Sequence, residues 1–244
     1  MIAKAIDKIL QIGGPYIKQI NGATYTSYPM VRVDNDLRAD PIRCRTLTGL
    51  VDYMDANKEA FNGWSGGYIC RVVNEKAVEL ISELDSDRKR ERIMIAEAET
   101  PELPVGRFME AENFLISAQA NFVAGTEAGT DLAKILQFAG TVTAGTIREY
   151  SDDGVSQKAT VKIGISTKAE KPVPSPALLA PFRTFTELPQ PASKFIFRMK
   201  DGNPPQCALF EADGGAWKNV AMAEIKSYLM TELGKRGMGV PVIA

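Results

Sequence analysis

The stretch PFRTFTELPQPASKFIFRMKDGNPPQCALFEADGGAWKNVAMAEIKSYL, which runs from Pro181 to Leu229, decides the fold. Within it, residues 194–200 alternate between apolar and polar side chains, and a turn rich in Asp, Gly, Asn and Pro separates them from a second run. Because successive side chains of a strand face opposite sides of a sheet, the pattern predicts a β-hairpin over residues 194–212. Residues 182–188 are expected to add a third strand.

A helix is predicted directly after this hairpin. Its apolar residues fall at i, i+4, i+8, i+11 and i+12, which is one helical face: Trp217, Ala221, Ile225, Tyr228 and Leu229. The pattern predicts a closing helix over residues 216–233, ended by Gly234. The stretch therefore predicts a sheet with one amphipathic helix packed across it.

The same signals recur along the chain. Helical spacing predicts helices over residues 2–12, 43–61 (with Thr46 as the N-cap), 108–122 and 131–139, the last ended by Gly140. Extended segments are expected over residues 25–33, 68–74, 76–84 and 91–99, a second hairpin over 146–165, and a Pro-rich connector over 171–181. The fold class that follows is α+β, with antiparallel sheets built from hairpins and amphipathic helices packed on one face.

The length of 244 residues fits one large domain or two small ones. The punctuated stretch Pro101–Pro104 is the best internal boundary. We therefore expect an N-terminal α+β region over residues 1–104. The C-terminal α+β region over residues 105–244 contains both hairpins and the closing helix.

The chain contains no histidine, which excludes several kinds of catalytic chemistry. Ser-His and Cys-His nucleophile pairs and His-ligated metal sites all need that side chain. Carboxylate-held magnesium and Lys or Tyr acid–base chemistry stay possible. No spacing singles out a catalytic residue, a metal ligand or a cofactor site, so an enzyme is less favoured than a binding protein.

The local sequence suggests two candidate binding sites, one for an anion and one for nucleic acid. Asp213-Gly214-Gly215 precedes the closing helix, where backbone N–H groups are able to bind an anion; the simpler interpretation is a strand exit with Asp213 near the positive helix end. The residues 124–131 form a second small-residue loop of this kind. Basic side chains form the other candidate, a nucleic-acid surface: Arg88, Lys89, Arg90, Arg92, Arg183 and Arg198, with Lys194 and Lys200.

The simpler interpretation of residues 85–92 is a solvated hairpin tip. Asp85, Asp87 and Glu91 nearly cancel its positive charge, and no aromatic residue is interleaved for base stacking. The net charge of the whole chain is −1, which does not demand a polyanionic partner. No apolar run reaches the roughly 20 residues of a membrane span. The N-terminus lacks a signal-peptide core, so we expect a soluble, cytoplasmic protein with no membrane partner.

Several segments together resemble one family. They are REYSDDGVSQKATVKIGI (148–165), PFRTFTELPQPASKFIFRM (181–199), ALFEADGGAWKNVAMAEIKSYL (208–229) and RTLTGLVDYMDANKEAF (45–61). They are similar to the YfdQ-like family of phages and prophages, whose function is unknown. The resemblance implies a virus-encoded protein in the cytoplasm of a bacterial host. It supplies no catalytic residues.

Three functional hypotheses follow. The first is a non-enzymatic assembly or binding protein that works as a homo-oligomer. The second is a nucleic-acid-associated accessory factor in phage recombination or replication. The third is a nucleotide-binding anti-defence protein, with Gly214 and Gly215 in the anion cradle.

Overall fold

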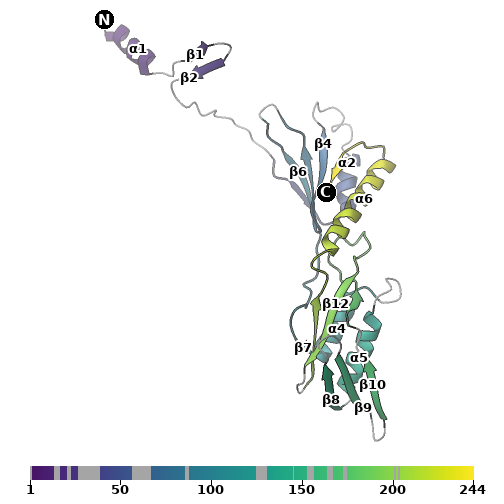
Figure 1. The fold of residues 1–244 in the computed structure, drawn as a ribbon. Helices are drawn as coiled ribbons and strands as arrows, with labels where there is room; N and C mark the ends of the chain where they lie inside the picture. The colour runs from purple at the N-terminus through teal and green to yellow at the C-terminus, as the bar shows by residue number, and fades with distance from the viewer. Residues whose placement is uncertain are drawn as a thin grey trace. The chain divides into compact units, whose positions relative to one another are not determined.

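The structure is a computed structural model, and its chain divides into two compact units, Met1–Ala39 and Asp40–Ala244 (Figure 1). It describes residues 2–13, 17–20, 23–26, 39–56, 67–85, 88–124, 131–144, 146–152, 157–163, 167–172, 175–200, 202 and 204–244. The structure is α+β, which confirms the predicted class. Among the described helices, none combines the length and apolar character needed to cross a bilayer.

The first unit contains a helix and a hairpin. Helix α1 (Ile2–Gly13) confirms the prediction for residues 2–12, and β1 (Ile17–Ile20) pairs antiparallel with β2 (Ala23–Thr26). The predicted extended segment 25–33 lies mostly outside the described residues. Ile2 and Ile6 are 78% and 51% exposed, so this part of the α1 apolar face is uncovered.

The second unit begins with a five-stranded sheet, in the order β14-β4-β5-β6-β3, and two helices cover one face of it (Figure 1). The strands are β3 (Ile42–Cys44), β4 (Tyr68–Asn74), β5 (Ala77–Ser82), β6 (Arg92–Glu97) and β14 (Val242–Ile243). The helices are α2 (Leu47–Ala56) and α6 (Trp217–Lys235). We call the apolar layer between them the first core. The three central strands are antiparallel, whereas the edge strands β3 and β14 join in parallel.

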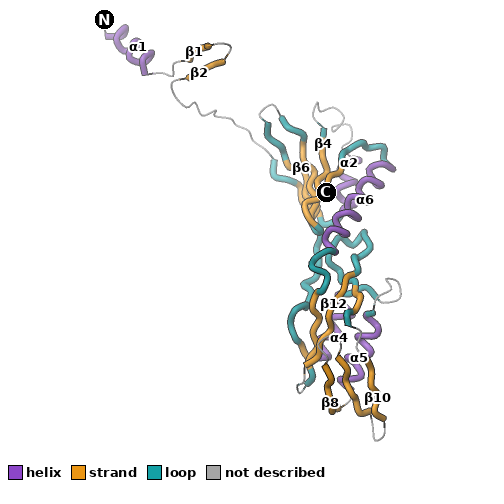
Figure 2. The backbone as a smooth tube through the Cα atoms, in the orientation of Figure 1, coloured by secondary structure: helices purple, strands orange, loops and turns teal. Residues whose placement is uncertain are grey.

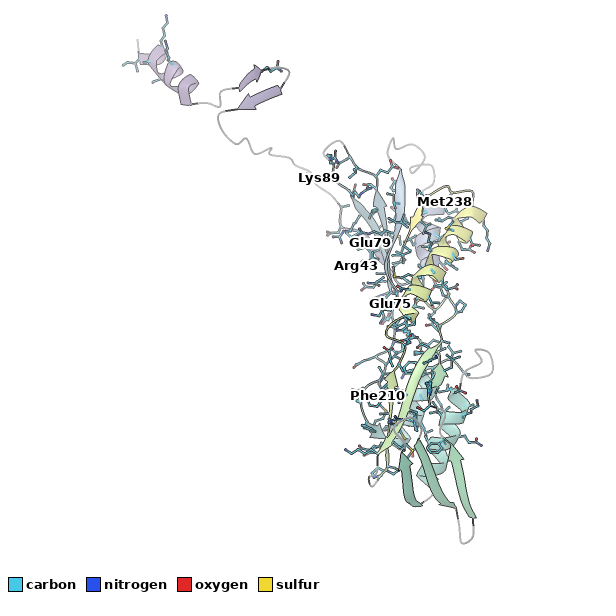
Figure 3. All side chains as sticks on the ribbon, viewed as in Figure 1. Arg43, Glu75, Glu79, Lys89, Phe210 and Met238 are labelled. Carbon is cyan, nitrogen blue, oxygen red and sulfur yellow. The ribbon has the colours of Figure 1, made fainter. Side chains whose placement is uncertain are left out.

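The other face of this sheet carries charged side chains. Glu79 is 8% exposed, and its carboxylate binds Arg71 (Nη2 to Oε2, 2.6 Å) and faces Arg92 (Nη1 to Oε1, 3.6 Å). Arg43 on β3 pairs with Glu97 at 3.5 Å. Figure 3 labels Arg43 and Glu79, which lie on β3 and β5, on either side of β6. Alternation along β4, β5 and β6 thus separates an apolar face under the helices from an ionic face.

A second core lies under helices α4 (Ala111–Asn121) and α5 (Leu132–Ala144). Its sheet has the order β11-β12-β13-β7, with β7 (Met109–Glu110), β11 (Ala177–Leu179), β12 (Ser193–Lys200) and β13 (Gln206–Glu211). The hairpin of β12 and β13 confirms the prediction for residues 194–212. Phe195, Phe197 and Met199 are buried as the alternation requires.

A third sheet contains β8 (Thr146–Asp152), β9 (Gln157–Ile163) and β10 (Thr167–Pro172), all antiparallel (Figure 2). Strands β8 and β9 form the hairpin predicted over 146–165. The connector predicted over 171–181 is wrong in part, because β10 includes Lys171 and Pro172 and β11 lies within it. Pro172 ends an edge strand, where its missing N–H is tolerated.

The strand predicted over residues 182–188 is wrong. This segment is irregular, and β11 (Ala177–Leu179) takes the place next to β12. The Gln190 side chain accepts hydrogen bonds from the N–H groups of Arg183 and Thr184, at 2.9 and 3.2 Å. These backbone donors are therefore satisfied by a side chain rather than by a strand partner.

Three helix boundaries differ from the prediction because of tertiary contacts. The helix expected from residue 43 begins at Leu47, since Ile42–Cys44 pairs with β6; residues 57–61 lie outside the described part of the chain. The helix expected from residue 108 begins at Ala111, since Met109–Glu110 pairs with β13. Gly140 does not end α5, because Ile135, Phe138 and Ala139 pack in the second core and carry the helix onward.

Helix α6 continues past Gly234 to Lys235, with Arg236 as its C-cap and Gly237 directly after it. Gly237 has φ +70°, its N–H donates to the Gly234 carbonyl (3.0 Å), and the Met238 N–H donates to the Leu233 carbonyl (3.0 Å). These two bonds are those of a Schellman motif with Gly237 at C′. Since α6 packs in the first core, the C-terminal part of the chain contributes to both cores. The division predicted after residue 104 stays a prediction.

This helix end predicts that alanine substitutions at two glycines change the stability of the protein in opposite directions. Gly237→Ala places a Cβ in the left-handed region and is expected to destabilise the protein by about 1 kcal/mol. Gly234→Ala, in the helix, is expected to stabilise it by about 0.5–1 kcal/mol, because a Cβ there meets open space. Urea unfolding of both variants measures the two signs, and equal effects would contradict the assigned helix end.

Candidate functional site

A cavity of about 450 Å³ lies at one end of the first core. Its walls include Met54, Tyr68, Glu83, Arg236, Met238 and Val240. Helix α2 supplies Met54, the start of β4 supplies Tyr68, the chain after β5 supplies Glu83, and the turn after α6 supplies the others. The volume falls within the range of small-molecule sites in proteins.

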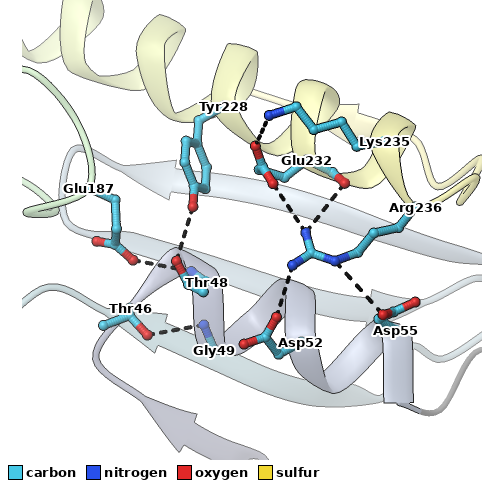
Figure 4. Close-up of polar contacts among 10 residues, drawn as sticks. All are labelled: Thr46, Thr48, Gly49, Asp52, Asp55, Glu187, Tyr228, Glu232, Lys235 and Arg236. Carbon is cyan, nitrogen blue, oxygen red and sulfur yellow. Dashed lines mark hydrogen bonds and ion pairs between the residues drawn. The ribbon is translucent and has the colours of Figure 1, made fainter.

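One wall of the cavity is fixed by an ionic network between α2 and α6 (Figure 4). Arg236 donates from Nη1 to Glu232 (3.2 Å) and from Nη2 to Asp52 (3.0 Å), and its Nε lies 3.9 Å from Asp55. Lys235 also binds Glu232, at 2.6 Å. This hydrogen bond from Lys235, together with the nearby charges, lowers the pKa of Glu232. Arg236 is thus held to α2 by two carboxylates, those of Asp52 and Asp55.

The start of α2 is capped by side chains from two parts of the chain (Figure 4). Thr46 Oγ1 accepts from the Gly49 N–H at 3.0 Å, which confirms Thr46 as the N-cap. Glu187 Oε1 accepts from the Thr48 N–H (3.1 Å), and the Thr48 and Tyr228 hydroxyls lie 3.0 Å apart. Burial raises the pKa of Cys44, and the charge of Glu187 adds to this effect.

Glu83 is the cavity residue whose carboxylate has no direct partner among the described residues, although Arg90 binds the carbonyl of the preceding Ser82. Its carboxylate makes no hydrogen bond or ion pair with the residues that the structure describes. The side chain lies over Gly67, where an added Cβ would come within 2.7 Å of Glu83 Oε1. Burial raises the pKa of Tyr68, another lining residue, with smaller contributions from Tyr53 and Glu91. The cavity therefore combines an apolar interior with one available carboxylate.

The predicted anion cradle is filled by its own aspartate. Asp213 Oδ1 accepts from the Gly215 N–H (3.0 Å), and Oδ2 accepts from the Trp217 N–H (3.2 Å). Gly214 and Gly215 have φ +63° and +80°, which lets the chain turn around this carboxylate. The geometry is that of a helix cap, the simpler of the two interpretations. Residues 125–130 of the other predicted cradle lie outside the described part of the chain.

The predicted basic surface is spread over two sheets. Arg88, Lys89 and Arg90 lie in the connection from β5 to β6, and Figure 3 places Lys89 at that end of the sheet. Arg90 Nη1 donates to the Ser82 carbonyl at 2.9 Å, and Arg92 faces Glu79. Arg198 lies on β12 and donates to the Phe197 carbonyl at 3.3 Å.

Arg183 lies in the interior, at 2% exposure. Its guanidinium donates to Glu211 Oε1 (3.1 Å), the Pro191 carbonyl (2.9 Å) and Ser193 Oγ (2.7 Å). It also stacks on Trp217, with Cζ 3.8 Å from the ring centroid. Desolvation lowers the pKa of Arg183 to about 10, against the opposing effects of Glu211 and Asp213. Arg183 therefore has a structural role, and it is too buried to contact a phosphate at the surface.

The irregular segment around Arg183 links the two cores. Thr184 Oγ1 donates to the Glu75 carbonyl at 2.6 Å, and Phe185 and Leu188 pack in the first core. Lys218 lies 3.8 Å from the Glu75 carboxylate. Residues 183–190, which we call the clasp, thus contact the first sheet on one side and the β12–β13 hairpin on the other.

Metal and thiol chemistry find little support in the described residues. Within the described ranges, no three Cys, Asp or Glu side chains are grouped so as to hold a metal ion. Burial raises the pKa of Cys70 and of Cys207 to about 12, so both are thiols at neutral pH. Cys207 is buried in the second core, as its position in the strand predicts.

No family model, curated protein or solved structure matches the chain. The cavity residues were not found in the sequence, because they come from four separate segments: residue 54, residues 67–68, residue 83 and residues 236–241. The glycines of GMGVP (237–241) are the one local signal of an unusual backbone there.

Proposed function

We propose that this chain is a phage- or prophage-encoded, non-enzymatic binding protein that works as a homo-oligomer. The observation that carries the binding function is the cavity between α2, β4 and the end of α6. It has a small-molecule volume and an apolar interior, and one carboxylate there is available. The phage origin is supported by the resemblance of the quoted segments to the YfdQ-like family.

The ionisable groups around the cavity support binding more than catalysis. General acid–base catalysis needs a group that is free to exchange a proton with the substrate. Arg236 is instead fixed by Glu232 and Asp52, and the thiol of Cys70 is buried between β4 and α2. These contacts stabilise the walls of a site rather than assemble a reacting pair.

Self-association is supported by helix α1. Ile2 and Ile6 lie one turn apart on the same side of the helix and are largely exposed within the described residues. Ile9 and Leu10 extend the same stripe in the sequence. A second copy of this helix offers an apolar face of the same length and width, so we propose that α1 pairs with α1 of another subunit.

We expect Ile2→Glu/Ile6→Glu to convert the oligomer to a monomer, because two charges would enter the apolar contact. Mass photometry of the full chain measures the change. The matched control is Lys4→Glu/Lys8→Glu, which places two glutamates at exposed positions of the same helix and is expected to keep the oligomer. A wild-type protein that is monomeric at micromolar concentration would overturn this part of the proposal.

The other two hypotheses have less support and stay predictions. Arg183 is buried and therefore does not contribute to a nucleic-acid surface. The remaining basic residues of the predicted surface are spread over two sheets. A nucleotide at Gly214 and Gly215 would compete with the Asp213 carboxylate for the same N–H groups. Loss of oligonucleotide binding with rising salt would be the mark of the first of these functions.

A further inference from the structure

We propose that the cavity binds a small organic cation, an amine carried on an aromatic or aliphatic body, with Glu83 as its counter-ion. This proposal rests on the binding function proposed above and adds the chemical class of the ligand. The ligand is a free small molecule. The observation that supports it is that one part of the cavity lining is apolar and another part is anionic.

The apolar part consists of Met54, Met238 and Val240, with the ring of Tyr68. Met54 is 1% exposed and belongs to the first core, so it forms a fixed inner wall. Figure 3 shows Met238 beside the end of α6. Thioethers contact aromatic rings favourably and adapt to irregular shapes, which suits the body of such a ligand.

The charges around the cavity select a cation. Arg236 lines the wall, but Glu232, Asp52 and Asp55 surround its guanidinium. With Lys235 included, these groups carry three negative and two positive charges. Glu83 adds a further negative charge that no described side chain balances. The cavity is therefore anionic overall, and it attracts a cationic ligand while it repels an anionic one.

Glu83 also has the position that a counter-ion needs. Glu83 lines the cavity, and its carboxylate lies against Gly67 rather than in the core. An amine beside Glu83 gains a charge-assisted hydrogen bond, and the ring of Tyr68, which also lines the cavity, offers a cation–π contact. A neutral ligand would lack both the cation–π contact and the attraction between opposite full charges.

Isothermal titration calorimetry of the full chain tests the proposal with two probes of one shape. Phenethylamine and hydrocinnamate both carry a phenyl ring on a short chain, with an ammonium in the first and a carboxylate in the second. We expect phenethylamine to bind and hydrocinnamate to bind at least about tenfold more weakly. Glu83→Gln is expected to weaken phenethylamine binding by about tenfold, whereas Glu102→Gln, at an exposed position, leaves it unchanged.

A second variant, at Gly67, displaces the Glu83 carboxylate without changing Glu83 itself. Gly67→Ala forces the Glu83 side chain to move, since the new Cβ would stand 2.7 Å from Oε1. Because a flexible side chain gives way easily, the fold is expected to persist while phenethylamine affinity falls. Unfolding curves that match the wild type establish that the loss is local.

The outcomes separate the ligand class from the binding function. Equal affinity for the two probes, or an unchanged affinity in Glu83→Gln, overturns the class of ligand and leaves the cavity a binding site. Failure of both probes to bind at millimolar concentration overturns the cavity as a site for either class. The oligomeric state of the α1 variants is unaffected by these results and tests self-association separately.

Discussion

Replacing Phe197 with alanine is expected to lower the free energy of unfolding by about 4 kcal/mol. The side chain is fully buried at the centre of the second core. Its ring meets Phe114 of α4 and Phe138 of α5 edge-on, with centroids 5.6 and 6.0 Å away. Alanine leaves a cavity between the sheet and both helices, and the surrounding rings lose their contacts.

Urea unfolding followed by circular dichroism measures this loss. Ile116→Ala is the matched control, because Ile116 lies on α4 but is 61% exposed. Its effect is expected to stay within about 0.5 kcal/mol. A loss of less than about 1 kcal/mol in Phe197→Ala would contradict the packing of α4 and α5 on β12.

Arg183→Ala is expected to cost about 3 kcal/mol. The substitution leaves the buried Pro191 carbonyl and Ser193 hydroxyl without their donor, and it removes the ion pair with the partly exposed Glu211 carboxylate. It also removes the group that stacks on Trp217. Because the clasp contacts both cores, the loss is expected to weaken their association as well as the local fold.

The same unfolding measurement tests Arg183 against two comparisons. Arg107→Ala removes an exposed arginine and is expected to change stability by less than about 0.5 kcal/mol. Arg183→Lys keeps the charge but not the planar fork, so its cost is expected to lie between the other two. If Arg183→Ala and Arg107→Ala destabilise equally, the buried role of Arg183 is wrong.

The elements that sequence predicts well are those whose periodicity reports their own burial. The alternation of Phe195, Phe197 and Met199 predicts β12 because one face of that strand is buried. The spacing of Trp217, Ile225 and Leu229 predicts α6 because one face of the helix lies in the first core. In both cases the local pattern and the tertiary packing agree.

The errors occur where a distant partner decides the local structure. Residues 182–188 have strand-like composition, but Gln190 and the buried Arg183 bind them into the clasp. The sequence predicts a helix end at Gly234, but Leu233 packs in the first core and the helix continues to Lys235, just before Gly237. Propensity alone does not choose between such alternatives.

The cavity could not be predicted from the sequence for a related reason. A local motif predicts a site when its residues are close in the chain, as with Asp213-Gly214-Gly215. The walls of this cavity meet only after α2, β4 and α6 have packed together, and Glu83 is an ordinary exposed glutamate in sequence. Charge that no neighbour balances becomes visible only in three dimensions.

Closure of the first sheet by α6 and β14 has a consequence for synthesis on the ribosome. Strand β6 ends at Glu97 and α6 begins at Trp217, which is 217 − 97 = 120 positions later. At about 5–20 residues per second, the nascent sheet waits roughly 6–24 s for its covering helix. During that interval the apolar face of β4, β5 and β6 is only partly covered, and a chaperone that shields nascent chains would find its substrate there.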